Sequence, residues 1–364
     1  MNKKIVYVAQ YVAHYHADMF QALNDKCHEN DDEFYLISVK KPPKVGRTGI
    51  HGKVIENHLF YNRDINVYIG NFRLYWQDGV LELLKEIKPD KIVFQGHVGC
   101  LTSWLAARMY RNKVYTWQCG YEYRKSKIKD ILQKIYLNDF VHHLAYHTEA
   151  KKFTMKYGIK EEDITVLHNT INQNKLKTTT IDESRTFLKN NYDILPDKKI
   201  LLYVGTLLEE KKVDILIKMM DLLDDSYVLI VVGDGPYKPE LEDMSGEKVI
   251  FTGAQMEDKH YFFTVADIFF MPGTGGLALN EAMFYSNILF SSLGDGSATD
   301  LVIENFNGKR IDGMSRVELA SLVNDLYKTD KINEYKKNAK SMSRKFLFKV
   351  FIDKFIKTIN NTGI

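Results

Sequence analysis

The sequence predicts an α/β protein with two domains, each built on a parallel β-sheet that helices cover on both faces. The chain has 364 residues and 45% hydrophobic content, enough for two sizeable cores. Short continuous apolar runs rich in β-branched residues alternate with longer helical patterns, which is typical of buried parallel strands. A segment rich in Asn, Lys and Thr, residues 172–199, lacks a strand signal and separates two groups of such runs. We therefore place the domain boundary near residue 175.

The expected strands follow one another at regular intervals with helical patterns between them. A helix over residues 182–191 is expected to lead into the second domain, and the glycine-rich loop at 272–276 to precede a helix. The apolar runs of the first half are residues 4–9, 34–39, 91–95, 114–117, 143–147 and 165–167, and those of the second half are 200–204, 227–232, 249–252 and 268–271, with 288–291 as a further candidate.

Composition excludes several classes of protein. A net charge of only +3 argues against a dedicated nucleic-acid-binding protein. The three cysteines, Cys27, Cys100 and Cys119, have neither metal-binding nor disulfide spacing, so a reduced cytoplasmic compartment is expected. The N-terminal apolar run is short and reads as a first strand, not a signal peptide. No apolar stretch approaches the roughly 20 residues that span a bilayer, which indicates a cytoplasmic protein, at most peripheral to the membrane.

Residues 271–283, MPGTGGLALNEAM, form the most informative motif. Gly273, Gly275 and Gly276 allow a sharp turn and let a ligand approach the backbone without meeting a Cβ atom. A helix that begins after them would direct unpaired N–H groups and its positive dipole end at an anion. Glu281 lies one helical turn behind this phosphate cradle. One glycine-rich loop is weak evidence, so its meaning depends on the motifs before it.

Three further motifs in the second half have the same order of strand, turn and helix. They are LLYVGTLLEEKK from residue 201, YVLIVVGDGP from residue 227 and VIFTGAQ from residue 249. In open parallel sheets, ligands bind outside the carboxyl ends of the strands. We therefore expect the four turns to converge on one ligand site.

This series of motifs resembles the donor domain of the retaining glycosyltransferases of family GT4, the glycosyl transferases group 1. The segment TVLHNTIN, residues 165–172, is similar to the family's asparagine motif before the interdomain linker. The resemblance implies GT-B architecture, with two Rossmann-like domains facing across a cleft. The implied domains are an acceptor-binding domain at 1–174, a nucleotide-sugar donor domain at 175–342 and a C-terminal helix at 343–364 that crosses back to the first domain.

The resemblance also implies roles for individual residues of the donor site. Lys211 matches the lysine that contacts the diphosphate, and Glu281 matches the glutamate that accepts hydrogen bonds from the ribose. Because backbone amides complete the phosphate cradle, no metal and no cofactor are expected. The alternative for both residues is a charged side chain that is exposed to solvent and contacts no ligand. The full set expected to bind the donor is Gly205, Thr206, Lys211, Gly233, Gly235, Pro236, Gly253, Gly273, Thr274, Gly275, Gly276, Leu277, Ala278 and Glu281.

Two positions depart from the family pattern. Gly273 stands where the family usually has a first glutamate, and Thr206 stands where it usually has an arginine. The site therefore lacks one carboxylate that touches the sugar and one cation that faces the diphosphate. We interpret this as altered donor recognition, and an inactive homologue is the alternative.

In the first half, five positions are candidates for contacts with the acceptor or the sugar. His97 resembles the family's cleft histidine and is the third catalytic candidate beside Lys211 and Glu281. His14 and His16 follow the first strand; they could face the site or merely form loop hydrogen bonds. Gln118 occupies a place where many members have histidine, and an amide cannot take up a proton at neutral pH. A fifth candidate, the carboxylate of Glu122, has a surface position as its alternative.

Residues 108–160 contain twelve Lys or Arg against four Asp or Glu. Within them, the helical pattern at 128–136 places Ile128, Ile131, Leu132, Ile135 and Tyr136 along one stripe. One interpretation is a core-facing stripe with a solvated basic face. The other is a surface that docks on anionic lipid.

These observations predict a metal-independent hexosyltransferase of class EC 2.4. It would move a sugar from a UDP- or GDP-sugar to a lipid-linked or cell-surface glycan, as in bacterial lipopolysaccharide or capsule synthesis. Nucleic acid is not an expected partner. The alternatives are a nucleotide-sugar 2-epimerase of GT-B fold and a non-catalytic nucleotide-binding homologue.

Overall fold

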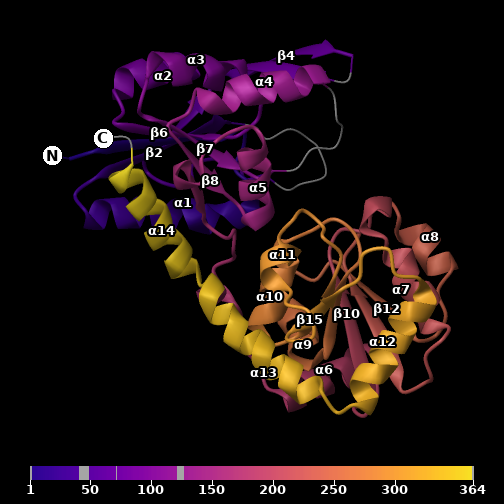
Figure 1. Ribbon diagram of the computed structural model, residues 1–364. Helices are drawn as coiled ribbons and strands as arrows, with labels where there is room; N and C mark the ends of the chain where they lie inside the picture. Colours follow the sequence, from indigo (N-terminus) through magenta and orange to yellow (C-terminus); the bar gives the residue numbers. More distant parts are fainter. Residues whose placement is uncertain (1, 41–48, 71, 121–126, 363–364) are drawn as a thin grey trace. The chain divides into compact units, whose positions relative to one another are not determined.

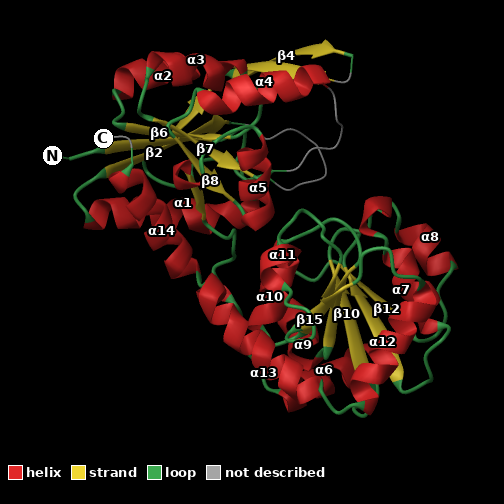
Figure 2. Ribbon diagram, viewed as in Figure 1, coloured by secondary structure: helices red, strands yellow, loops and turns green. Residues whose placement is uncertain are grey.

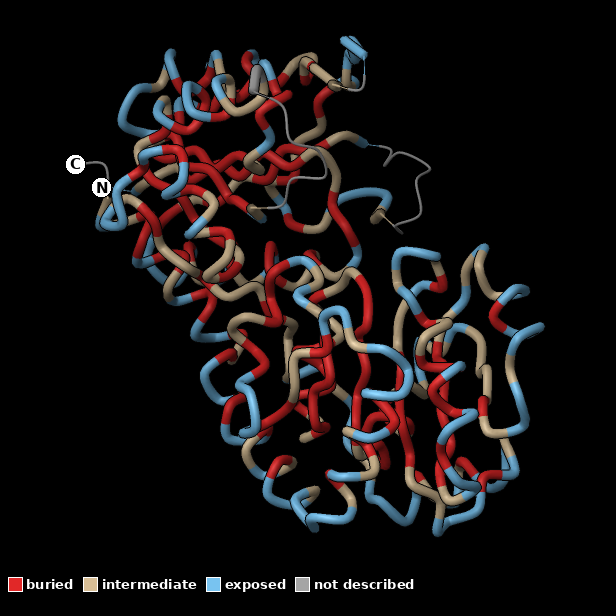
Figure 3. Tube along the Cα trace, turned by 45° about the vertical axis from the view of Figure 1, so that its right-hand side comes forward, coloured by how far each residue is buried: buried red, intermediate tan, exposed pale blue. Residues whose placement is uncertain are grey.

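The structure is a computed structural model that describes residues 2–40, 49–70, 72–120 and 127–362 (Figures 1 and 2). The chain forms two compact units. Unit 1 comprises Met1–His168 and Lys349–Ile364, and unit 2 comprises Asn169–Phe348. In each unit the buried residues follow the strands of a central sheet (Figure 3). No described helix is both long and apolar enough to span a bilayer.

Unit 1 is built on a seven-stranded parallel sheet with the order β3-β2-β1-β6-β7-β8-β9. Its central strands are buried along their whole length, as β7 shows, which explains their continuous apolar sequences. The strand order reverses between β1 and β6, the position at which open parallel sheets bind ligands. The strands are β1 (Lys4–Val8), β2 (Glu33–Val39), β3 (His58–Tyr61), β6 (Lys91–Gln95), β7 (Val114–Gln118), β8 (His142–Ala145) and β9 (Ile164–Val166).

Helices cover both faces of this sheet (Figure 1). Residues from α2, α3 and α4 share one core cluster with the sheet, whereas α14 contacts the opposite face, where Trp117 packs against Phe351 and Phe355. The helices of unit 1 are α1 (Ala17–Glu29), α2 (Val80–Ile87), α3 (Leu101–Met109), α4 (Lys127–Asn138), α5 (Thr148–Lys156) and α14 (Phe348–Asn361).

An antiparallel hairpin of β4 (Arg63–Ile69) and β5 (Phe72–Asp78) forms a separate two-stranded sheet in unit 1. The sequence prediction missed this hairpin and the edge strand β3. Six of the seven residues of β4 are exposed, and the remaining one, Asp64, is half-buried. The strand therefore lacks the buried pattern on which the prediction relied. The predicted strand at 143–147 is real but ends at Ala145.

The C-terminal helix returns to unit 1, but it begins at Phe348 and not at residue 343. Helix α13 occupies the chain as far as Ser343, and a 3-10 turn at Arg344–Phe346 intervenes. At the other boundary, the Thr170 hydroxyl donates a hydrogen bond of 2.7 Å to the carbonyl of Phe346. This bond ties the linker to unit 2, so unit 2 begins several residues before the boundary expected near 175.

Unit 2 contains a six-stranded parallel sheet with the order β12-β11-β10-β13-β14-β15. Its order reverses between β10 and β13, so the loops after these two strands flank the expected binding position. The strands are β10 (Lys199–Val204), β11 (Tyr227–Val232), β12 (Val249–Gly253), β13 (Ile268–Met271), β14 (Ile288–Ser291) and β15 (Gly308–Arg310). The predicted α/β class with two parallel sheets is confirmed.

The helices of unit 2 include the two that the sequence predicted. The helix expected at 182–191 is α6, which begins with a capping box between Thr180 and Glu183. The helix behind the glycine loop is α10. The helices are α6 (Ile181–Tyr192), α7 (Val213–Met220), α8 (Lys238–Asp243), α9 (Lys259–Val265), α10 (Leu277–Phe284), α11 (Ala298–Leu301), α12 (Arg316–Lys328) and α13 (Ile332–Ser343).

Candidate functional site

The turns after β10 and β11 pack backbone against backbone. The amide of Leu207 donates to the carbonyl of Asp234 at 2.9 Å. A Cβ atom on Gly233 would lie 1.9 Å from the Gly205 carbonyl oxygen, and one on Gly235 would lie 2.3 Å from that of Leu207. Any side chain at Gly233 or Gly235 would therefore push the two loops apart. These glycines are required by loop packing, whatever they contribute to a ligand.

The remaining turn positions differ in their surroundings. Thr206 and Pro236 are exposed at the ends of their strands. Gly253 has a φ of +71° with open space around it, a left-handed conformation that glycine adopts without strain. Its carbonyl accepts a hydrogen bond of 2.9 Å from the amide of Gly233, which links the third turn to the second.

Lys211 joins the loop after β10 to the glycine-rich loop after β13. It ends a 3-10 turn at Glu209–Lys211, and its ammonium donates a hydrogen bond of 2.6 Å to the carbonyl of Thr274. The amide of Thr274 in turn donates to the carbonyl of Glu210 at 3.3 Å. A Cβ atom on Gly273 would lie 2.1 Å from that same carbonyl oxygen. The structure thus brings together Lys211 and the phosphate cradle, which are more than 60 residues apart in the sequence (|i−j| = 63).

Helix α10 begins at Leu277 without a side-chain cap at Gly276. The backbone N–H groups of its first turn, which include those of Leu277 and Ala278, have no helical acceptor. Such an uncapped terminus behind a glycine loop can bind an anion.

Asp295, in the loop after β14, lies next to this helix terminus and was missed by the sequence analysis. A Cβ atom on Gly276 would lie 2.4 Å from its Oδ2 atom. Its Oδ1 atom accepts hydrogen bonds from the Ser297 amide at 3.0 Å and hydroxyl at 2.7 Å. No local motif marks this aspartate, since only the fold brings the β14 loop to the β13 loop.

We expect the substitution Asp295→Asn to strengthen the binding of a nucleoside diphosphate about twofold to fivefold, because a solvent-exposed like charge is removed from the phosphate cradle. Isothermal titration at low salt would measure this gain in affinity, and high salt should abolish it. A weaker affinity in Asp295→Asn would mean instead that the carboxylate itself contacts the donor.

Glu281 is buried and paired, not solvated. Its side chain on α10 is 9% exposed, and the Lys259 ammonium lies 2.8 Å from each carboxylate oxygen, donating a hydrogen bond to Oε2. A buried carboxylate requires such compensation. Lys259 begins α9, in the fourth position after the VIFTGAQ motif, and the sequence analysis did not identify it. The surface-charge alternative for Glu281 is therefore wrong, while its role toward ribose stays a prediction.

In unit 1, the candidate histidines near β1 lie in a 3-10 turn at His14–His16. His14 is exposed, whereas His16 is 8% exposed and its ring lies 5.9 Å from that of Trp117. The two side chains thus occupy different environments. The extended conformation that two histidines two positions apart would need for a shared metal is not formed here.

His97 follows β6 and is exposed at the carboxyl end of the sheet. Its Nδ1 atom accepts a hydrogen bond of 3.2 Å from the Gly99 amide, so the neutral ring carries its proton on Nε2. Desolvation and the positive charges of Arg73 and Lys129 lower its pKa to about 4. At neutral pH the ring is therefore uncharged and its Nε2–H group can donate a hydrogen bond, a geometry that favours donation over a general-base role.

Gln118 ends β7 and is 2% exposed. Its side chain lies over Gly96, where a Cβ atom would come within 2.3 Å of its Nε2 atom. Among the described residues this nitrogen has no hydrogen-bond partner. Gln118 and His97 thus lie at the carboxyl ends of the neighbouring strands β7 and β6. Glu122 lies outside the described residues.

The helical stripe at 128–136 is only partly core-facing. Tyr136 is fully buried and its ring packs 5.5 Å from that of Trp104, but Ile131 and Ile135 are 62% and 46% exposed. The interpretation of the whole stripe as core-facing is therefore wrong for these two residues.

Comparison with known proteins defines the class of the fold. Residues 184–344 match the family Glycosyl transferases group 1. The chain is 33% identical over 119 residues to the sulfoquinovosyl transferase SQD2 of Arabidopsis thaliana, a match that spans 31% of this chain but only 23% of that protein.

Solved structures match over nearly the whole chain. Anabaena Alr3699/HepE in complex with UDP has a TM-score of 0.77 at 15% identity, covering 98% of this chain and 99% of that one. The same protein with UDP-glucose has a TM-score of 0.74 at 17% identity, covering 99% and 100%. The lipopolysaccharide outer core galactosyltransferase WaaB has a TM-score of 0.67 at 16% identity, covering 98% and 99%.

The architecture is therefore that of the GT-B glycosyltransferases. Within it, residues 184–344 of unit 2 match the glycosyl transferases group 1, and this match supports the resemblance drawn from the sequence motifs.

Proposed function

We propose that this protein is a metal-independent, retaining hexosyltransferase that uses a nucleoside-diphosphate sugar. The observation that carries this proposal is the joined pair of loops after β10 and β13. There Lys211 is hydrogen-bonded to Thr274 O, in the loop that leads into the uncapped α10, and α10 carries the buried Glu281 carboxylate. A cation, free backbone N–H groups and a carboxylate are the groups that a diphosphate joined to a ribose would need.

In the proposed reaction, the bond between the sugar C1 and the diphosphate oxygen breaks while a bond from the acceptor hydroxyl oxygen to C1 forms. The hydroxyl proton passes to the departing diphosphate on the same face of the sugar. Negative charge grows on the leaving group, so the Lys211 ammonium and the α10 N–H groups stabilise the transition state more than the ground state. Glu281 would accept hydrogen bonds from the ribose hydroxyls.

UDP is the first nucleotide to test, because a structure of the same fold holds UDP and UDP-glucose; GDP is the second. For the acceptor we propose a lipid-linked or cell-surface glycan, such as a bacterial lipopolysaccharide or capsule precursor, met at the cytoplasmic face of the membrane. The exposed Ile131 and Ile135 of α4, which lie in a basic stretch of sequence, favour such a location.

Thermal unfolding with UDP, GDP, ADP and CMP tests the donor site. A ligand at about 100 times its Kd adds about 2.7 kcal/mol to the free energy of unfolding. We expect one diphosphate to raise the Tm at micromolar to millimolar concentration and CMP to have little effect. If no nucleotide raises the Tm, unit 2 does not contain a working nucleotide site and the proposal fails.

Incubation with the matching nucleotide-sugar then separates the possible activities. Slow donor hydrolysis with retention of anomeric configuration, followed by NMR, is the expected result. An inverted product contradicts the retaining mechanism, and an epimerised donor identifies an epimerase. Binding of the nucleotide without hydrolysis or transfer would identify a non-catalytic homologue.

A further inference from the structure

The hairpin of β4 and β5 has one entirely apolar face near its tip. The cross-strand pairs on this face are Ile65 with Trp76, Val67 with Leu74, and Ile69 with Phe72. Exposure rises along β4 toward the tip, from 43% at Ile65 to 55% at Val67 and 64% at Ile69, and Tyr68 on the other face is 67% exposed. Water thus contacts a strip of large apolar side chains that a stable fold would normally bury.

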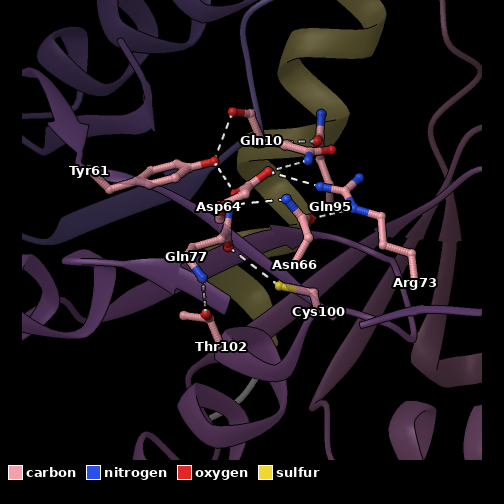
Figure 4. Close-up of polar contacts among 9 residues, drawn as sticks. All are labelled: Gln10, Tyr61, Asp64, Asn66, Arg73, Gln77, Gln95, Cys100 and Thr102. Atoms are coloured by element: carbon pink, nitrogen blue, oxygen red, sulfur yellow. Dashed lines mark hydrogen bonds and ion pairs between the residues drawn. The ribbon is translucent and has the colours of Figure 1, made fainter. Parts of the chain in front are cut away.

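The opposite face of the hairpin is fixed to unit 1 by polar contacts (Figure 4). The Asp64 carboxylate accepts hydrogen bonds from the Tyr61 hydroxyl at 2.8 Å, from Arg73 at 3.1 Å, and from the Gln10 amide. Nearer the base, the backbone N–H of Gln77 donates to the Thr102 hydroxyl at 2.7 Å. The hairpin is therefore held in place by these polar contacts and by Phe72 and Trp76 of β5, which are half-buried and pack against the core of unit 1. The apolar side chains of β4 remain exposed.

Two helices beside the hairpin also expose apolar residues. Helix α3 packs on β5, as the bridge between Tyr75 and Cys100 shows, and it packs on α4 through Trp104 and Tyr136. In Figure 1 the hairpin, α3 and α4 lie together along one side of unit 1. Their exposed apolar residues, which we call the hairpin surface, are Ile65, Val67, Tyr68 and Ile69 of β4, Leu101, Leu105 and Met109 of α3, and Ile131 and Ile135 of α4.

The charges around the hairpin surface are mostly positive where water reaches them. The charged residues of β4, α3 and α4 that are classed as exposed in the described structure are Arg63, Arg108 and Lys134. The neighbouring acidic side chains are engaged: Asp64 pairs with Arg73, and Asp139, directly after α4, pairs with Arg108. Asp130 of α4 is 41% exposed, and its carboxylate accepts a hydrogen bond of 2.8 Å from the Tyr157 hydroxyl. Apolar side chains bordered by cations complement an anionic lipid surface. A symmetric contact with a second copy of the chain would instead bring like charges together.

We propose that the hairpin surface docks unit 1 on an anionic phospholipid bilayer, with the tip of the β4–β5 hairpin entering the headgroup region. The apolar tip supplies the insertion, and Arg63 and Lys134 supply the attraction to lipid phosphates. This inference deepens the proposed function, because it names the surface by which the enzyme would reach a lipid-linked acceptor.

Sedimentation of the full-length protein with vesicles tests the proposal. We expect binding to phosphatidylcholine vesicles that contain about 30% phosphatidylglycerol, and much weaker binding to phosphatidylcholine alone. The double variant Val67→Asp/Ile69→Asp should bind the anionic vesicles at least about tenfold more weakly, and Lys134→Glu about fivefold more weakly. Met256→Asp, at a residue of unit 2 that is 75% exposed, is the matched control and should bind like the wild type.

Failure of this inference can be told apart from failure of the proposed function. UDP-induced stabilisation, measured in parallel, reports on unit 2 and should be unchanged in Val67→Asp/Ile69→Asp. The three tryptophans of the chain, Trp76, Trp104 and Trp117, lie in unit 1, so cooperative unfolding followed by tryptophan fluorescence shows that unit 1 of the variant is folded. The proposal is overturned if the wild type does not bind anionic vesicles, or if the double variant binds them as well as the wild type. A wild-type dimer in solution that the double variant abolishes would assign the surface to a second copy instead.

Discussion

Replacing Lys211 with Met is expected to lower kcat by about 10²-fold to 10³-fold, the usual effect of removing one donor to a developing negative charge. The ammonium lies within the loop pair that faces the α10 terminus, at 2.6 Å from Thr274 O. Lys211→Arg is the matched variant, because it keeps the charge with a different shape. Steady-state transfer or donor hydrolysis would measure both.

Comparing the loss of kcat with the loss of UDP affinity in the Lys211 variants separates a chemical role of this lysine from a structural one. If Lys211 only holds the two loops together, UDP affinity and kcat should fall by similar factors, and Lys211→Arg should not restore the rate. If it stabilises the leaving group, kcat should fall more than UDP affinity, with partial rescue by arginine. A Lys211→Met rate within about threefold of the wild type would contradict its role in the charge stabilisation that this mechanism requires.

Glu281→Ala is expected to weaken UDP binding about tenfold to 100-fold, because hydrogen bonds to a charged group contribute about 1.5–3 kcal/mol. The loss should concern the ribose. The wild type should therefore prefer UDP to its 2′,3′-dideoxy analogue, and Glu281→Ala should bind the two nearly equally. Isothermal titration with both ligands measures this, and a preserved preference in the variant would contradict ribose recognition by Glu281.

Lys259→Met should reduce the preference for UDP over its 2′,3′-dideoxy analogue, although Lys259 is not among the residues proposed to contact the ligand. The substitution leaves the Glu281 carboxylate, which is 9% exposed, without its cation. We expect a loss of unfolding free energy of about 2 kcal/mol, less than for a fully buried pair because the Lys259 side chain is 37% exposed. Lys336→Met is the matched control: it removes the partner of Asp267, 3.1 Å away in the same unit. The control should lose stability but keep the full preference for UDP.

The parts of the structure that the sequence predicted are those with a local signal. Strands such as β10 and β11 are continuous apolar runs that end in glycine turns, and both features lie within a few residues. The loops after them contact one another as the parallel topology requires, so Lys211 and Thr274 meet. The motif around Glu281 likewise predicted a carboxylate behind the cradle.

What the sequence could not predict depends on contacts between distant residues. Lys259 and Glu281 are on different helices. No sequence pattern around an isolated lysine after a turn predicts that it pairs with a buried carboxylate. The β4–β5 hairpin was missed because its apolar residues face water, whereas pattern analysis assumes that they face a core. Arg73, which helps lower the pKa of His97, was missed with it.

Unit 1 is assembled from two separate stretches of the chain, and this affects the order of events during synthesis. Residues 1–168 leave the ribosome early, but the face of Trp117 against which Phe351 and Phe355 pack is covered only when α14 emerges. Until then the nascent first unit carries an uncovered aromatic surface of the kind that holding chaperones bind. A premature stop codon before residue 348 would thus damage the half of the protein that was translated first.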